Sequence, residues 1–164
     1  MPRKIAHSAD DLPTIDQTLS ITGLEFMTRI LSGDFAGPPI GATLNYTLSR
    51  VEEGLVEFVG TPVFEVTNPM GTVHGGWYGT LLDSCMACAV MTKVPKGSVY
   101  TTLEYKINIL RSIPLGTEVR AIGQTQHVGR STGVAIGEIR GVADDRLYAT
   151  GSTTCIIMPI QPKP

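Results

Sequence analysis

Hydrophobic residues follow a helical period near the start of the chain and again in its middle. Between residues 20 and 31, apolar side chains recur every three or four positions, which predicts an amphipathic helix. From Trp77 to Val94 the residues are almost all apolar or small, without proline, and they occupy every side of a helical wheel. A helix that is apolar all round is typical of a buried helix. We therefore predict one long helix at the centre of the fold.

Alternating apolar and polar residues predict strands on both sides of this helix. Two strands precede it and are joined by a tight turn at Glu52, Glu53 and Gly54, and four more follow it. The predicted strands cover residues 43–51, 55–61, 99–110, 118–128, 132–142 and 147–158. Because the buried helix needs cover on all sides, we expect about six mostly antiparallel strands to wrap around it, an α+β architecture with an extra N-terminal helix.

Length, charge and cysteine content narrow the class of protein. A chain of 164 residues fits one domain with its own core, which we place at residues 19–160, between an N-terminal arm (1–18) and a tail (161–164). The net charge of −2, with both signs interspersed, offers no basic patch for nucleic acid. The first residues lack the apolar run of a secretory signal, and three cysteines are an odd number. These features predict a cytoplasmic protein that binds neither nucleic acid nor membrane.

Two features of the buried helix carry candidate chemistry. Asp83 lies among apolar residues, and an ionised carboxylate buried without partners is costly, so we expect it to be paired, protonated or used in a reaction. Cys85 and Cys88 form a Cys-x-x-Cys pair, but there is no second pair and no histidine at ligand spacing. We expect both cysteines, and Cys155, to pack in the core rather than to bind metal.

The motif Asn-Pro-x-Gly-x-x-His-Gly-Gly at residues 68–76, with Asp83 nine residues after the histidine, resembles the hot-dog fold acyl-CoA thioesterases. The branch it resembles most is the PaaI-type, phenylacetate-degradation branch, and the resemblance extends over about residues 20–158. It implies a hot-dog fold and hydrolysis of aryl- or medium-chain acyl-CoA. It also implies coenzyme A as part of the substrate, no separate cofactor, and a homodimer or a homotetramer made of two dimers.

The start of the buried helix and Asp83 would divide the chemistry between them. Gly75 and Gly76 leave backbone N–H groups open to a thioester carbonyl at the positive end of the helix, although a simple tight loop is the alternative. Asp83 would act as general base on water or attack the thioester itself, the alternative being a structural partner. Gly75 and Asp83 are about 12 Å apart at ~1.5 Å per residue, whereas reacting atoms must lie within ~3–3.5 Å. We therefore expect two antiparallel helices in a dimer, with Gly75 of one copy facing Asp83 of the other.

The resemblance implies roles for residues around this pair. Asn68 would hold the carbonyl oxygen or shape the loop, with an Asx turn as the alternative. His74 would assist binding or product release, with a loop-ordering hydrogen bond as the alternative. Thr102 would position the water, but strand alternation places Thr101 on the apolar face instead, so this choice stays open.

Three further residues are candidates for the phosphate end of coenzyme A: Arg111, Arg130 and Ser131. Arginine suits phosphate because its planar group is always charged, and exposed surface charge is the alternative. Two other functions stay open for the whole chain. An enoyl-thioester hydratase uses the same fold, and a non-catalytic acyl-CoA sensor would bind the ligand without turning it over.

Overall fold

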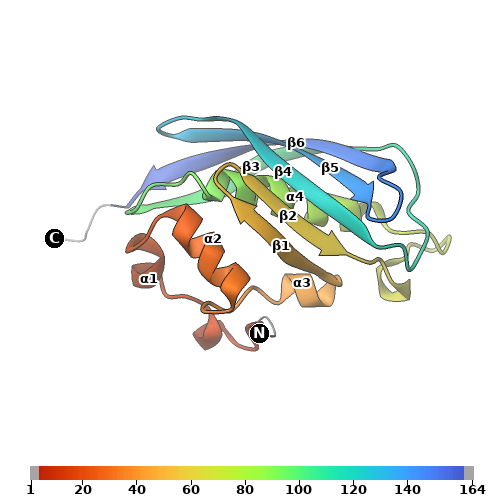
Figure 1. The fold of residues 1–164 in the computed structure, drawn as a ribbon, viewed down its shortest axis with the longest axis horizontal. Helices are drawn as coiled ribbons and strands as arrows, with labels where there is room; N and C mark the ends of the chain where they lie inside the picture. The colour runs from red at the N-terminus through yellow and green to blue at the C-terminus, as the bar shows by residue number, and fades with distance from the viewer. Residues whose placement is uncertain (1–3, 161–164) are drawn as a thin grey trace.

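The computed structural model describes residues 4–160, and the predicted tail at 161–164 lies outside this range. Its helices are η1 (Ala9–Asp11), α1 (Ile15–Leu19), α2 (Gly23–Ser32), α3 (Ile40–Thr43), η2 (Phe64–Val66) and α4 (Gly75–Met91). Its strands are β1 (Tyr46–Glu52), β2 (Leu55–Gly60), β3 (Ser98–Ile109), β4 (Val119–Val128), β5 (Thr132–Gly141) and β6 (Leu147–Pro159). Figure 1 shows the long helix α4 beneath the arching strands. The expected architecture of one sheet wrapped around one helix is confirmed.

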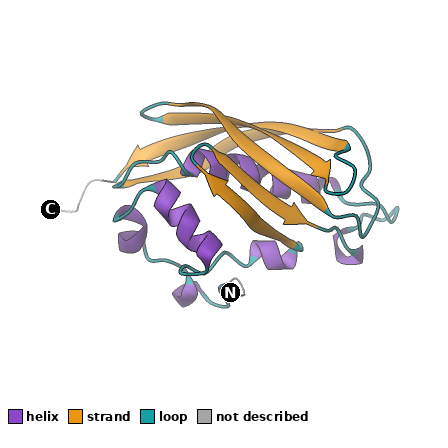
Figure 2. Ribbon diagram, viewed as in Figure 1, coloured by secondary structure: helices purple, strands orange, loops and turns teal. Residues whose placement is uncertain are grey.

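All six strands form a single antiparallel sheet in the order β1-β2-β4-β5-β6-β3. Within the described part of the chain, β3 is therefore an edge strand that pairs only with β6. The short helices α1 to α3 gather on the side of the sheet where β1 lies (Figure 2). The sheet thus leaves one long strand, next to α4, with an open edge.

The helix α4 is buried because its side chains are apolar and because the sheet lets it approach closely. Leu82 and Met86 are fully buried. A Cβ atom on Gly123 of β4 would lie 2.1 Å from the carbonyl oxygen of Cys85, and one on Gly137 of β5 would lie 2.7 Å from the Met86 side chain. Larger residues at these two glycines would push the helix away from the sheet, so the glycines set the position of α4.

The N-terminal region contains more structure than hydrophobic periodicity predicts. The helix α1 lies mostly within the predicted arm and is capped by Thr14, whose side chain accepts from the backbone N–H of Gln17. Five residues are too few to show a clear helical period, so this helix is not predictable from the pattern. The first residue of α2, Gly23, donates its N–H to the carbonyl oxygen of Val94 at 2.9 Å. This bond fixes α2 against the C-terminal end of α4.

A β-bulge in β3 decides which of its side chains face α4. The ladder to β6 shifts register between Thr102 and Glu104. Before the bulge Thr102 faces the helix, where it contacts Asp83. After it Tyr105 faces the helix, where its hydroxyl oxygen lies 3.3 Å from the Cβ position of Gly79. The uniform alternation expected across residues 99–110 is therefore wrong, because one extra residue changes the parity of the strand.

Candidate active site

The loop before α4 is ordered by its own polar groups. The side-chain oxygen of Asn68 accepts from the backbone N–H groups of Met70 at 2.9 Å and Thr72 at 3.3 Å. Its amide nitrogen donates to the hydroxyl oxygen of Thr72 at 2.8 Å. This is the Asx turn named above as the alternative for Asn68. Its side chain therefore shapes the loop that leads into the helix.

His74 is the N-cap residue of α4. Its ring nitrogen Nδ1 accepts a hydrogen bond of 2.9 Å from the backbone N–H of Gly76, and its carbonyl oxygen accepts from Trp77 N–H at 3.0 Å. A Cβ on Gly76 would lie 3.0 Å from Nδ1, so the glycine lets the ring come this close. An accepting Nδ1 requires a neutral ring that carries its hydrogen on Nε2. The loop-ordering bond expected as the alternative for His74 is thus present.

These contacts leave Gly75 as the open donor at the helix start. The N–H of Gly76, expected to be available together with that of Gly75, is already bound by His74. The Gly75 N–H has no acceptor among residues 4–160. A Cβ atom added to Gly75 would have the Ile109 side chain of β3 as its neighbour, at 3.6 Å. One unoccupied N–H at the positive end of a buried helix is suited to a negatively charged or polarised oxygen.

Asp83 lies two turns into α4 and is half-buried. Its oxygen Oδ1 accepts a hydrogen bond of 3.0 Å from the hydroxyl of Thr102, whereas Thr101 is exposed. Burial raises the pKa of Asp83 above its ordinary value, and the Thr102 hydrogen bond opposes this rise. A carboxylate with a raised pKa and one bonded oxygen can take up a proton at the other oxygen.

Within one chain the open donor and the carboxylate do not meet. Gly75 lies beside Ile109 and Asp83 beside Thr102, near opposite ends of the edge strand. Eight helical residues separate the two by about 12 Å. Within one chain, a single carbonyl group therefore cannot contact both the Gly75 N–H and the Asp83 carboxylate.

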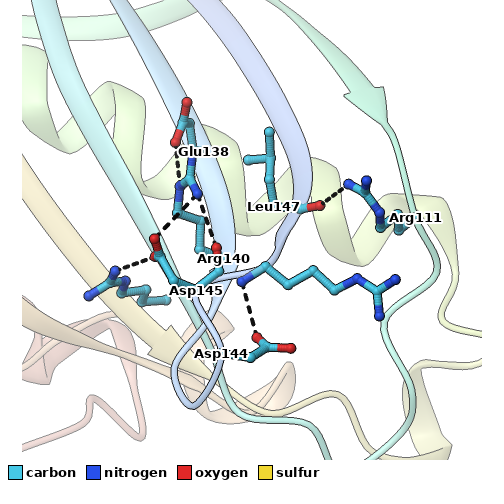
Figure 3. A network of polar contacts seen from close by, with 8 residues as sticks. Arg111, Glu138, Arg140, Asp144, Asp145 and Leu147 are labelled. Atoms are coloured by element: carbon cyan, nitrogen blue, oxygen red, sulfur yellow. Dashed lines mark hydrogen bonds and ion pairs between the residues drawn. The ribbon is translucent and has the colours of Figure 1, made fainter.

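The three candidates for phosphate binding are exposed and lie at two ends of the sheet. Arg111 follows β3 and donates from its side chain to the carbonyl oxygen of Leu147 at 2.8 Å (Figure 3). Arg130 and Ser131 lie in the turn between β4 and β5, where the carbonyl oxygen of Ser131 accepts from Ile157 N–H. Since Ile157 pairs with the first residues of β3, this turn lies at the other end of that strand. The structure does not bring Arg111 together with the other two.

Other arginines near Arg111 are held by carboxylates. Arg140 contacts Glu138 at 2.7 Å and Asp145 at 3.5 Å, and Arg120 contacts Asp145 at 2.6 Å (Figure 3). These ion pairs are partly exposed, so each contributes little to stability. They tie the turn between β5 and β6 to the ends of β4 and β5.

The cysteines are free thiols of the core region. Cys85 and Cys155 are fully buried and Cys88 is half-buried. Burial raises the pKa of Cys88 to about 12, so its thiol stays protonated at neutral pH. Residues 4–160 contain no group of three histidine, cysteine or acidic side chains arranged to hold a metal ion. Across the same residues, no helix combines the length and the apolar character that crossing a membrane requires.

One polar pair near Asp83 could not be anticipated from the sequence. The hydroxyl groups of Tyr46 in β1 and Ser84 in α4 lie 3.0 Å apart. The two residues are 38 positions apart in the chain, and no motif links them. Ser84 follows Asp83 directly, so the only available signal was its position beside that carboxylate.

The known proteins that this chain resembles are described as thioesterases or as an esterase. Residues 70–149 match the family model of the thioesterase superfamily. A Caenorhabditis elegans protein named as a proposed esterase is 30% identical over 95 residues, which cover 58% of this chain and 56% of that protein. The matched region therefore spans about half the length of this curated relative.

Solved structures share the fold over most of the chain. A proposed thioesterase of Ralstonia eutropha JMP134, related to phenylacetic acid degradation, is 28% identical with a TM-score of 0.72, covering 80% of this chain and 98% of its own. A thioesterase family protein of Silicibacter pomeroyi has the same TM-score at 24% identity, covering 81% of this chain and 98% of its own. The hot-dog fold and the PaaI-type resemblance expected from the sequence are confirmed.

Proposed function

We propose that this chain, whose residues 70–149 match the family model of the thioesterase superfamily, hydrolyses acyl-CoA thioesters to a free acid and coenzyme A. The observation that carries the proposal is the half-buried Asp83 carboxylate, bonded to Thr102. It lies on the buried helix whose first N–H group is open. Both a base and an oxyanion donor are thus available on one rigid element.

In this mechanism Asp83 acts as the general base. Thr102 holds Oδ1, and Oδ2 removes a proton from a water molecule as the water oxygen attacks the thioester carbonyl carbon. Negative charge then develops on the carbonyl oxygen, where the Gly75 N–H donates to it. The carbon–sulfur bond breaks, the carboxylic acid forms, and coenzyme A leaves as the thiol after taking up the proton. One such donor contributes about 2.7–4 kcal/mol to transition-state stabilisation.

A dimer is needed to join the two halves of the site. We propose that β3 pairs with β3 of a second copy in antiparallel orientation, around a two-fold axis near Tyr105. The midpoint between Gly75 and Asp83 on α4 is Gly79, and the Cβ position of Gly79 lies 3.3 Å from the Tyr105 hydroxyl. The middle of the Gly75–Asp83 stretch thus lies beside Tyr105, near the middle of β3. An axis there brings each Gly75 next to the second copy's Asp83.

The open edge of β3 supports this assembly. An edge strand exposes unpaired backbone groups, and its exposed apolar side chains are costly in water. Leu103 is 59% exposed, Tyr105 46% and Ile109 46%. Pairing two such edges satisfies the backbone groups and covers these side chains. In the same arrangement Arg111 approaches Arg130 of the second copy, which would collect positive charge for the phosphates of coenzyme A. Pairing of two dimers into a tetramer remains part of the proposal.

Thiol release from a panel of acyl-CoA substrates tests the activity. The wild-type protein should release coenzyme A, and Asp83→Asn should lose at least about 100-fold in kcat, since general base catalysis contributes about 10²–10⁴-fold. Asp16→Asn, on the exposed side of α1, is the matched control and should keep wild-type activity. Equal rates for wild type and Asp83→Asn would exclude this mechanism. Tight binding of acyl-CoA without turnover would identify a sensor.

A further inference from the structure

At its bulge, β3 has one residue more than the strand β6 beside it. Thr102 lies opposite Cys155 of β6. Three positions later, Tyr105 lies opposite Thr153, which is only two positions from Cys155. Leu103 is left without an opposite residue in β6, and its side chain is exposed. Regular pairing would reverse the direction of the side chains on one side of this point, so the bulge has to be held in place.

A buried hydroxyl group contacts the backbone of β3 at this bulge. Thr153 is 1% exposed and lies on the same face of β6 as Gly151, whose Cβ position is 3.1 Å from the Met86 side chain of α4. The hydroxyl of Thr153 donates a hydrogen bond of 2.7 Å to the carbonyl oxygen of Glu104, directly after the extra residue. A hydroxyl in an apolar core is costly unless it is bonded, and valine would fill the same space without that cost. The bond to the bulge, rather than packing, therefore accounts for a threonine here.

The hydroxyl of Thr153 is also connected to the contact between Thr102 and Asp83. Burial raises the pKa of the Cys155 thiol, and hydrogen bonds with the side chains of Thr102 and Thr153 oppose this rise. The thiol is thus within hydrogen-bonding reach of both hydroxyl groups. Thr102 in turn donates to Oδ1 of Asp83 at 3.0 Å. A row of polar groups therefore leads from β6, across the edge strand, to the carboxylate on α4.

We propose that Thr153 is a positioning residue for the base Asp83. Its hydrogen bond to Glu104 holds the bulge of β3, and the bulge in turn keeps the Thr102 hydroxyl directed at the carboxylate. Without this bond the bulge is free to move along the strand, and a shift by one residue turns Thr102 away from α4. Thr153 acts on the reaction only through Thr102. The inference rests on the proposed hydrolysis, in which Asp83 removes a proton from water.

Replacing the hydroxyl by a methyl group tests this role. Thr153→Val keeps the shape of the side chain but lacks the donor, whereas Thr153→Ser keeps the donor. We expect kcat/KM for octanoyl-CoA to fall about threefold to tenfold in the valine variant, as for the loss of one neutral hydrogen bond. The serine variant should stay near the wild-type value. Thr154→Val makes the same change at the next residue, on the opposite face of β6, and is the matched control.

Two further readouts separate positioning from a general effect on the fold. Burial raises the pKa of Asp83 and the Thr102 hydrogen bond opposes this rise, so the acid limb of kcat/KM should move to higher pH in Thr153→Val. It should not move in Thr153→Ser or Thr154→Val. In a Thr102→Val background, Thr153→Val should change kcat/KM by less than about twofold, because two residues that act through one contact are not additive. Fully additive effects, or an acid limb at the wild-type pH, would overturn the proposal.

A measurement without substrate distinguishes this outcome from failure of the proposed function. If the wild type hydrolyses no acyl-CoA, carbon-13 NMR of aspartate-labelled protein, with Asp83→Asn for assignment, follows the titration of Asp83 alone. A higher pKa in Thr153→Val, with no further rise when this change is added to Thr102→Val, supports the positioning role in a non-catalytic protein. An unchanged pKa rejects it. Thermal unfolding verifies that each variant is folded, and Thr153→Ala, which lacks the donor and needs less room, replaces a valine variant that does not fold.

Discussion

The hydroxyl of Thr102 donates a 3.0 Å hydrogen bond to Oδ1 of Asp83, across the gap between the edge strand β3 and the central helix α4. This contact exists because the β-bulge after Thr102 lets that residue and Tyr105 face the same helix. It holds the oxygen Oδ1, whereas no hydrogen bond holds the other carboxylate oxygen within residues 4–160. The position of the Asp83 carboxylate relative to β3 is thus linked to an irregularity of the strand.

Replacing Thr102 by valine should lower kcat/KM by about tenfold or more, because a hydrogen bond to a charged group contributes about 1.5–3 kcal/mol. In the wild type, the hydrogen bond from Thr102 lowers the pKa of Asp83, so this pKa should rise further when the bond is lost. The acid limb of the pH–rate profile should then move to higher pH. Thr101→Val is the matched control because Thr101 is exposed. If both variants behave alike, Thr102 does not position the base.

Asp83→Asn should make the protein more stable at neutral pH while it removes activity. The folded state raises the pKa of Asp83, so folding favours the protonated form. The resulting stabilisation is complete below the ordinary value of 3.8 and is lost as the pH rises through the folded-state pKa. At pH 7 the ionised group therefore lowers stability, and asparagine removes that cost. Urea unfolding at pH 7 and at low pH should show a gain that shrinks with acidification. A loss of stability at pH 7 would contradict the assigned direction.

Gly75→Pro should remove the oxyanion donor with little damage to the fold. Proline is favoured at the first position of a helix, and the preceding residue, His74, already has an extended backbone with ψ of 138°. The variant lacks the N–H group, so kcat should fall by about 10²–10³. Gly75→Ala keeps the donor, and its Cβ makes only an ordinary 3.6 Å contact with Ile109. We expect it to retain most activity. A Gly75→Pro protein that is folded and fully active would rule out this N–H group as the donor.

The central part of the fold was predictable because its signals are local. A run that is apolar all round predicts a buried helix, and the charge at Asp83 is conspicuous within it. The choice between Thr101 and Thr102 was not predictable, since a bulge depends on pairing with β6, 50 residues away in sequence. The hydrogen bond from the Gly76 N–H to the His74 ring was not predictable either, because it depends on the orientation of that ring. The apolar cavity lined by the N-terminal segment and α4 was not predictable either, because the sequence contains no periodic signal for the packing of residues 4–13.

Mixing two inactive variants tests the shared site most directly. Asp83→Asn chains and Gly75→Pro chains, carrying different affinity tags, are co-expressed and the mixed dimer is isolated. Each mixed dimer contains one site with both its Asp83 and its Gly75 N–H intact, and one site with neither. We predict that it recovers about half of the wild-type activity per dimer, whereas each homodimer stays inactive. A mixed dimer as inactive as its parents would contradict a site built from two chains.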